Sequence, residues 1–368
     1  MHAARRATSP AGRRSARLAA LLLVPVVALG ACASSDEPGV PLPDTETTDA
    51  ADTTSDEGPL VIYSGRGEDL VAPLIEQFEE ASGIETEVRY AGSAEQAQLL
   101  LTEGESSPGH VFLSQEAGAL GLVGDAGLLT ALPEDVLGSV PEAYVADDGT
   151  WVGITGRARV VAYDSEQVDE ADVPDTVAEI IDPRWSGEIG VAPGNASFLA
   201  FVTALRLTEG EDGAAAWLEA LAANDAATYE KNSAILEAVN TGEVQLGLIN
   251  HYYWYSAAAE QGAENMRAQL KFGADGDVAA LVNATGVGIL GGGEGRADAL
   301  AFVDYLLSED GQTYFATTEF EYPLVPGIDG PEGVPPLDSL NGPEIDLSDL
   351  GTVVESAALV DEAGLTVG

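Results

Sequence analysis

The sequence predicts an α/β fold with a mostly parallel sheet, divided between about two domains. The chain has 368 residues, which exceeds the ~100–200 residues of one ordinary domain. From residue 60 onward, short apolar runs alternate with segments whose apolar residues recur at helical spacing. Such alternation is typical of parallel strands joined by helices that cover the sheet.

The alternation is clearest between residues 60 and 115. The apolar run LVIY predicts a strand, and the next segment places Leu74, Ile75 and Phe78 on one helical face, with Gly83 as the expected helix end. IETEVRY alternates as a strand does, AEQAQLLLTEGESS predicts a helix, and HVFLSQ predicts a strand. The order strand, helix, strand, helix, strand underlies the predicted fold class.

The same pattern continues along the rest of the chain. WVGITGRARVVAYD, residues 151–164, predicts long strand material that passes between two domains. Further helices are expected in SFLAFVTALRLTEG, GAAAWLEALAAN and GRADALAFVDYLLSEDGQTYFATT, and further strands in VQLGLI and VAALVNATGVGIL.

The first 31 residues predict a signal peptide. Arginines precede the apolar run LAALLLVPVVALG, which is shorter than the ~20 residues that a membrane span needs. Cys32, the only cysteine, follows directly, and its setting resembles a bacterial lipobox, in which the sulfur carries a lipid. Two acyl chains anchor a protein stably. The alternative is an ordinary signal peptide with an incidental cysteine.

Residues 32–59 predict a disordered tether. From residue 34 the segment reads SSDEPGVPLPDTETTDAADTTSDEGP, with almost no large apolar side chain. Such a composition cannot bury enough surface to offset the entropy of ordering the chain. We therefore expect a folded body held away from a membrane by this tether.

The chain is strongly acidic, with 62 Asp and Glu residues against 15 Lys and Arg, a net charge of −47. Some of the basic residues lie in the predicted signal peptide and none of the acidic ones do. This balance argues against nucleic acid, which proteins bind through Lys and Arg. Because the acids are spread along the whole chain, we interpret them as a solubilising surface rather than a cation site.

Signatures of catalysis are sparse. The mature chain has two histidines, His110 and His251, and no cysteine besides Cys32. The sequence has no P-loop, no dinucleotide fingerprint and no arrangement typical of a Ser-His-Asp triad. We therefore expect that the protein is not an enzyme.

The stretch NHYYWY, residues 250–255, gathers aromatic residues although these make up only 6% of the chain. Tyr252 and Tyr253 follow a predicted strand, at the kind of junction where α/β folds bind ligands. A phenolate is a hard oxygen donor, and its pKa near ~10 means that a strongly charged cation such as Fe³⁺ must displace the proton. The alternative is half-buried packing, which residue type alone favours.

Several stretches together resemble one known family. They are VIYSGRGE, SSPGHVFLSQEAGAL, WVGITGRARVVAYD, DPRWSGEIGVAP, YEKNSAILEAVNTGEVQLGLINHYYW and EYPLVPGI, and NxYYW after an apolar strand is the most specific. In this order they are similar to the ferric-ion-binding proteins of iron(III) ABC transporters, over about residues 60–325. The resemblance implies a type II periplasmic-binding-protein fold, with two α/β lobes and a ligand cleft between them.

The resemblance also implies lobe boundaries. Lobe 1 would comprise residues 60–156 and about 283–322, and lobe 2 residues 157–282 and about 323–368. The chain would then cross between the lobes near Thr155 to Arg157, near Val282 to Gly286 and again near Glu321 to Pro323.

Members of the family bind Fe³⁺ together with an exogenous anion such as phosphate or carbonate, and this implies metal ligands here. The family's adjacent tyrosines correspond to Tyr252 and Tyr253. Its histidine position holds Gly67, so that ligand is missing. Its glutamate position holds Gln115, with Glu116 one place further on, and both are kept as candidates.

The family's anion-binding region corresponds to small and polar residues at a helix start and to two asparagines. Backbone N–H groups at a helix N-terminus favour a bound anion. Arg66 and Arg157 are further candidates, because either guanidinium would neutralise an anion, although each could instead form a surface salt bridge of little energetic value. The corresponding positions are Asn195, Ala196, Ser197, Asn232 and Asn250.

The resemblance implies an extracytoplasmic lipoprotein, anchored to the outer face of a bacterial cell membrane. It would act as a monomer, capture Fe³⁺ and deliver it to an ABC permease driven by an ATPase. Two alternatives stay open. One is the same fold binding an organic anion or phosphonate without iron, which the missing histidine allows. The other is an enzyme or surface-interaction protein on a two-lobe scaffold.

Overall fold

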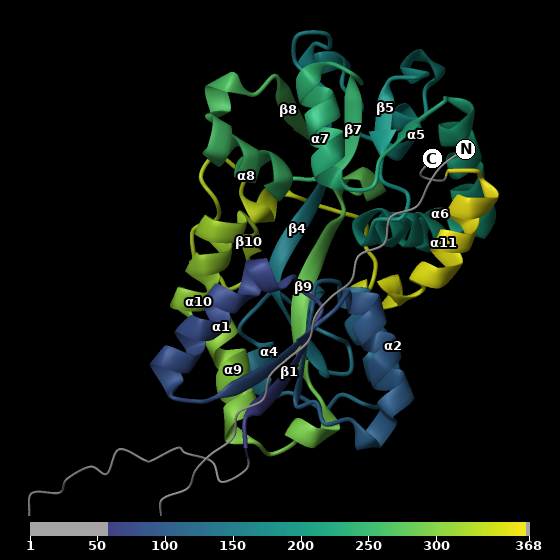
Figure 1. Ribbon diagram of the computed structural model, residues 1–368. Helices are drawn as coiled ribbons and strands as arrows, with labels where there is room; N and C mark the ends of the chain where they lie inside the picture. The colour runs from purple at the N-terminus through teal and green to yellow at the C-terminus, as the bar shows by residue number, and fades with distance from the viewer. Residues whose placement is uncertain (1–57, 366–368) are drawn as a thin grey trace, which may run out of the picture. The chain divides into compact units, whose positions relative to one another are not determined.

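A ten-stranded sheet organises the described part of the chain, residues 58–365 of the computed structural model (Figure 1). Eight strands follow one another in the order β2-β1-β3-β9-β4-β7-β5-β6, and β8 and β10 both pair with β4. The strands are β1 (Leu60–Ser64), β2 (Thr86–Tyr90), β3 (Val111–Ser114), β4 (Trp151–Asp164), β5 (Ile189–Val191), β6 (Ala227–Thr228), β7 (Leu246–Asn250), β8 (Ala268–Phe272), β9 (Val282–Ile289) and β10 (Tyr322–Pro323).

Helices of very different length connect these strands. None of the helices in residues 58–365 is both long and apolar enough to cross a membrane. They are α1 (Glu68–Ser82), α2 (Ser93–Glu103), α3 (Ala117–Asp125), α4 (Glu134–Leu137), α5 (Val177–Ile180), α6 (Ala196–Ala223), α7 (Asn232–Thr241), α8 (Tyr252–Gln261), α9 (Ala297–Leu307), α10 (Glu309–Tyr314) and α11 (Val353–Glu362).

The expected signal peptide (1–31), the lipidation site Cys32 and nearly all of the expected tether (32–59) lie outside the described residues. Within the described range, the first predicted elements are confirmed. Helix α1 buries Leu74, Ile75 and Phe78 as its spacing predicts, and it ends at Gly83, whose φ of 73° is the left-handed conformation of a helix C-cap. Strand β4 has the predicted bounds, and all of its residues are buried.

The sheet is less parallel than predicted. Strand β1 pairs in parallel with β2 and β3, and β5 pairs in parallel with β6 and β7. The central ladders, β3 with β9, β9 with β4 and β4 with β7, are antiparallel. The expectation of a mostly parallel sheet was wrong at the centre of the sheet. Strands β4 and β9 are not joined by a local helical crossover, and they run in opposite directions.

The three predicted crossing segments lie side by side in the structure. Strand β4 pairs with β9 through residues 151–158 and with β7 and β8 through residues 159–164. Thr155 is the partner of Thr285, and Gly156 is the partner of Tyr322 in β10. Figure 1 shows β4 and β9 running together from the part of the sheet that contains β1 towards β7 and β8.

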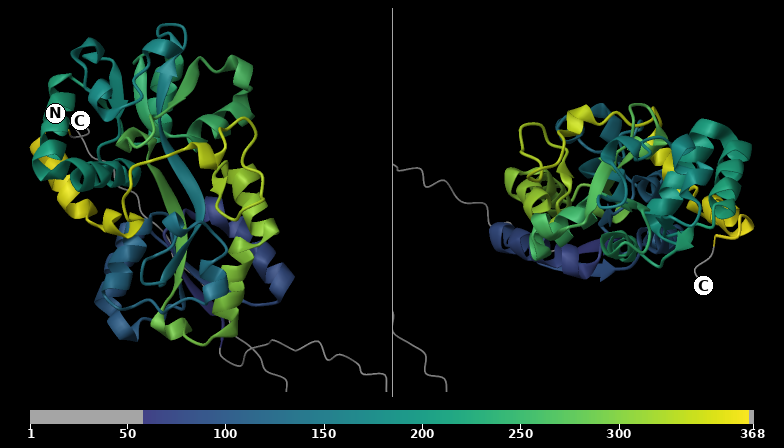
Figure 2. Two further views of the ribbon diagram at one scale, coloured as in Figure 1. Left: turned by 180° about the vertical axis from the view of Figure 1, so that it is seen from behind. Right: turned by 90° about the horizontal axis from the view of Figure 1, so that it is seen from above.

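The C-terminal segment packs against two separate regions of the chain. Helix α11 lies against α6, and the 3₁₀ segment η10 (Leu347–Gly351) lies against α3 (Figure 2). The second contact is close because Gly118 and Gly121, one turn apart on α3, face backbone atoms of Leu350 and Ser348. A Cβ atom built on Gly118 would lie 2.2 Å from the carbonyl carbon of Leu350.

We predict that Gly118→Ala lowers the free energy of unfolding by about 1–3 kcal/mol, since the new methyl group must push the backbone of η10 away. The loss should appear although Ala is the better helix former. Gly291→Ala is the control, because a Cβ there meets nothing within 4 Å. Urea unfolding of both variants measures the difference, and equal stability would contradict the packing.

Candidate metal and anion site

Tyr252 and Tyr253 are the first two residues of α8, immediately after the buried strand β7. Their rings are stacked with centroids 4.4 Å apart, and both side chains are half-buried. The N-terminus of a helix carries a partial positive charge, which favours a phenolate over a phenol. The structure therefore places two stacked phenol rings at the start of a helix, where the helix dipole partly offsets the cost of a negative charge.

His251 holds the start of α8 against the centre of the sheet. Its side chain is fully buried, and its Nδ1 accepts a hydrogen bond of 3.1 Å from the backbone N–H of Ala158 in β4. Its ring lies 4.7 Å from that of Tyr322 in β10. Burial lowers the pKa of His251 to about 4, so the imidazole is neutral near pH 7. The histidine positions the tyrosines.

Charged groups surround Tyr252. Burial is the main cause that raises the pKa of Tyr252, and neighbouring Tyr253 and Glu321 raise it further, while Arg157 lowers it. The phenol thus keeps its proton unless a cation displaces it. Among residues 58–365, no group of three or more His, Cys, Asp or Glu side chains is arranged to hold a metal ion. A metal at this position would depend on the phenolic oxygens.

Arg66 forms a buried ion pair rather than a surface salt bridge. Its Nη1 lies 2.7 Å from Glu321 and donates a bond of 3.1 Å to Thr285, and its Nη2 lies 3.4 Å from Glu319. Thr155 donates a hydrogen bond to Glu321 in turn. Arg66 thereby joins the turn after β1 to all three crossing segments, which leaves its Nη atoms occupied by protein groups.

Arg157 and Glu116 form a second buried pair. Arg157 lies 3.2 Å from the carboxylate of Glu116, which also accepts a hydrogen bond from Asn283. The backbone carbonyl of Gln115 accepts another bond from Arg157. Burial works to lower the pKa of Arg157, but attraction to Glu116 and Glu321 raises it overall. In this arrangement the carboxylate of Glu116 already has a cation partner.

Arg159 is the residue that sequence reasoning missed. Its side chain is 3% exposed and donates hydrogen bonds to Ser197 (3.1 Å), to Asn250 (3.4 Å) and to the carbonyl of Leu248 (2.9 Å). All of these acceptors are neutral, and burial lowers the pKa of Arg159 to about 10. The guanidinium still carries its charge near pH 7. The sequence could have indicated Arg159, because Arg157 and Arg159 are two residues apart on one strand and their side chains therefore share a face of the sheet.

The predicted anion residues do come together next to Arg159. Asn195 caps α6 by accepting a bond of 3.0 Å from the backbone N–H of Ser197, and Ala196 is the first residue of that helix. Asn232, the first residue of α7, donates a bond of 3.0 Å to the hydroxyl of Ser197. The N-termini of α6 and α7 thus meet at one polar cluster, where their backbone dipoles favour an anion.

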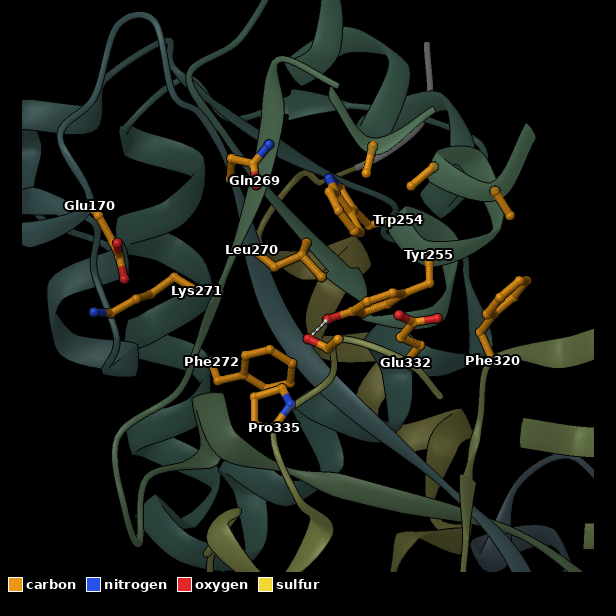
Figure 3. Close-up of a pocket in the computed structure, with 14 residues that line it drawn as sticks. Glu170, Trp254, Tyr255, Gln269, Leu270, Lys271, Phe272, Phe320, Glu332 and Pro335 are labelled. Carbon is orange, nitrogen blue, oxygen red and sulfur yellow. Dashed lines mark hydrogen bonds between the residues drawn. The ribbon is translucent and has the colours of Figure 1, made fainter. Parts of the chain in front are cut away.

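The cavity at this cluster is small. About 10 Å³ is enclosed, between Glu116 and Arg157 on one side and Ser197 and Asn250 on the other. This is the space of roughly one water molecule, so an anion larger than that needs the surrounding groups to separate. A much larger cavity, of about 830 Å³, lies on the side of α8 that carries Trp254 and Tyr255 (Figure 3), but neither Tyr252 nor Tyr253 lines it.

Gly67 is the N-cap of α1, with an ordinary extended backbone conformation (φ −61°). A Cβ there would come close only to the flexible end of Asp69, at 2.7 Å, with Leu70 in ordinary contact at 3.9 Å. Nothing in the local backbone therefore demands glycine. The position next to Arg66 simply provides no side chain that ligates a metal.

Comparisons with known proteins give the family of this chain. The bacterial extracellular solute-binding protein family matches residues 108–339. The major ferric iron-binding protein of Neisseria meningitidis serogroup B is 32% identical over 311 residues, which cover 83% of this chain and 93% of that protein. The chain belongs to this family of solute-binding proteins.

Two further relatives agree with this assignment. The Fe(3+)-binding periplasmic protein of Serratia marcescens is 33% identical over 315 residues, which cover 85% of this chain and 92% of that protein. The crystal structure of iron-bound HitA from Pseudomonas aeruginosa matches with a TM-score of 0.77 and 32% identity, over 83% of this chain and 99% of that one. The solute-binding protein therefore has the predicted type II periplasmic-binding-protein fold, and its relatives are binding proteins, not enzymes.

The buried cluster of this solute-binding protein gives a prediction about pH. Glu319 is 9% exposed, and burial raises its pKa to about 7, against the pull of Arg66. An unfolded glutamate titrates near ~4.3. Between these two pKa values the folded state binds more protons, so this contribution to stability is lost as pH rises through about 7.

We therefore predict that Glu319→Gln, which resembles the protonated side chain, flattens the change in stability between pH 5 and pH 7, the interval in which mainly the folded state keeps the proton. The wild type should lose stability from this group over the same interval. The exposed Glu134→Gln is the control for removal of one charge. Urea unfolding at the two pH values decides, and an unchanged slope in Glu319→Gln would show that Glu319 is ionised throughout.

Proposed function

We propose that this protein binds Fe³⁺ through Tyr252 and Tyr253, together with an anion held at Arg159, for iron uptake. The observation that carries the proposal is the stacked tyrosine pair at the start of α8, adjacent to a buried arginine whose hydrogen-bond acceptors are all neutral. Phenolates supply hard oxygen donors for Fe³⁺, and the guanidinium supplies a partner for the anion.

The relatives support this cargo. The proteins from Neisseria meningitidis and Serratia marcescens, each at least 32% identical to this chain, are both named as ferric-iron-binding proteins. The match covers more than nine tenths of each relative, so the comparison involves whole binding proteins rather than a shared fragment. The anion is our inference from the site itself.

Proton release is the chemistry that these residues contribute. Each phenol loses its proton when it ligates the metal, and the proton leaves to solvent. The N-terminus of α8 and the nearby Arg157 favour the resulting phenolate at Tyr252. The iron affinity should therefore fall as the pH falls, because protons and Fe³⁺ compete for the same oxygens.

The anion would lie where α6 and α7 begin. Arg159 already donates to Ser197 and to Asn250, and Asn232 and Asn195 extend the cluster. An anion here would accept from Arg159 and from backbone N–H groups of the helix start, and its remaining oxygens would complete the coordination of iron beside the tyrosines. Phosphate and carbonate both have the required oxygens.

Glu116 is a conditional ligand in this proposal. Its carboxylate pairs with Arg157 and Asn283, so ligation of iron requires these bonds to rearrange. Arg157 would then be free to face the anion. Gln115 is kept as the alternative donor at this position. Arg66 has a different role, because its bonds to Glu321 and Thr285 connect the crossing segments rather than face the anion cluster.

Transport follows from a change between open and closed states. Lobes divided at the crossing segments would close on iron and anion as a population shift towards the state in which both lobes contact the ligand. The closed form would dock on an ABC permease driven by an ATPase. Lipidation of Cys32 would keep the protein, as a monomer, at the outer face of the membrane.

The decisive test is a Fe³⁺ titration of the metal-free protein, followed by visible absorption. We predict a tyrosinate-to-iron band that saturates at one equivalent. Tyr252→Phe and Tyr253→Phe should each weaken iron binding by more than about 100-fold, since each removes a ligand. Tyr255→Phe is the matched control, because its hydroxyl donates to the carbonyl of Gly333 on the other side of the helix.

Absence of the band in phosphate and in carbonate would overturn the ferric proposal. Tight, iron-indifferent binding of an organic anion or phosphonate would then make that ligand class the function, with the tyrosines as hydrogen-bonding or packing groups.

A second variant tests the anion separately. Arg159→Met should reduce the gain in iron affinity that phosphate or carbonate provides by about tenfold or more, because a charge-assisted contact to the anion is lost. Arg206→Met is the control, since Arg206 pairs with Glu211 outside the cluster. If both variants keep the full anion effect, the anion is bound elsewhere.

A further inference from the structure

A second, apolar cavity adjoins the proposed anion cluster. It has a volume of about 240 Å³ and lies between α2 and α3 on one side and the start of α6 and the C-terminal segment on the other. Its walls are mostly alanine, leucine and valine side chains, including Ala119, Leu199 and Val354. An engineered apolar cavity of ~150 Å³ is sufficient to hold a benzene ring, so this space admits one six-membered ring with substituents.

The apolar cavity and the small polar cavity share two lining residues. Glu116 and Ala200 line both of them. The carboxylate of Glu116 is paired with Arg157, so it presents little uncompensated negative charge. Arg159 lines the polar cavity as well. It is buried, and it forms no ion pair with a carboxylate in the described part of the chain. Once the groups around the polar cavity separate, a single molecule with one charged end and one apolar end would reach both spaces.

Val354 is unusually exposed for an apolar residue. Its side chain is 70% exposed, the highest value among the exposed large apolar residues of the described range, and it forms part of the cavity wall. Leu207 is 44% exposed on α6, and it is not part of that wall. An apolar side chain held at the edge of an apolar cavity is expected where a ligand with apolar surface enters.

We propose that the anion of this protein is an amphipathic monocarboxylate with an apolar body of about one ring, such as a benzoate-class acid. The carboxylate would bind Arg159, Ser197 and the start of α6, and the ring would lie in the apolar cavity against Leu199 and Val354. Phosphate or carbonate would fill only the polar part and leave the apolar walls in contact with water. The inference rests on the proposed anion subsite and names its ligand class.

The test measures binding of benzoate, acetate and phosphate by calorimetry, to the iron-free protein and to the protein with one equivalent of Fe³⁺. Benzoate should bind about tenfold or more tighter than acetate, because only the ring differs. Val354→Glu should remove this advantage by placing a carboxylate beside the ring. Leu207→Glu adds the same charge to an exposed apolar position outside the cavity and should keep the advantage.

Ala119→Met, which fills the cavity from α3, provides a second variant and should also bring benzoate down to the level of acetate. Equal affinities for benzoate and acetate in the wild type would overturn the inference, as would an equal effect of Val354→Glu and Leu207→Glu. Failure of the ferric proposal is distinguishable, since it appears as a missing iron band in every buffer while the benzoate-to-acetate ratio is still measured without iron.

Discussion

A buried charge needs a partner, and this constraint organises the centre of the molecule. Three guanidinium groups, those of Arg66, Arg157 and Arg159, are almost fully buried around β4. Glu321 neutralises the first, with Glu319 close by, and Glu116 neutralises the second. Removing one partner of such a buried pair typically costs about 3–5 kcal/mol, so these contacts fix how the crossing strands lie against one another. The third guanidinium has only neutral acceptors.

The three buried arginines therefore differ in whether the protein itself supplies a negatively charged partner. Two arginines stabilise the fold, whereas Arg159 keeps a positive charge that a ligand can neutralise. In the proposed function the tyrosine pair would take the cation, because Fe³⁺ is a strong enough Lewis acid to displace the protons that its oxygens hold. In the proposed function a metal cation at the tyrosines and an anion at Arg159 would bind together. The small polar cavity and the larger apolar cavity near Arg159 would then determine which anion fits.

Local patterns predicted the fold well where a single element was involved. The apolar spacing of α1, its glycine cap and the unbroken apolar strand β4 were readable because each depends on neighbours in the sequence. The antiparallel centre of the sheet was not readable from the sequence, because it depends on which distant strands pair.

For the site, the family resemblance predicted the adjacent tyrosines and the clustering of Asn195, Ser197, Asn232 and Asn250. Two features depend on the three-dimensional packing: the pairing of Glu116 with Arg157, and the lack of an ion pair between Arg159 and any carboxylate of the described residues.

The most direct test of the central claim is a crystal structure of the protein loaded with Fe³⁺ and anion, with iron located by its anomalous scattering. We predict one iron ion bonded to the phenolic oxygens of both Tyr252 and Tyr253, and an anion bridging from the iron to Arg159. An iron ion bound away from the tyrosine pair would contradict this prediction. So would an iron ion bound at the pair while Arg159 still donates only to Ser197, Asn250 and Leu248.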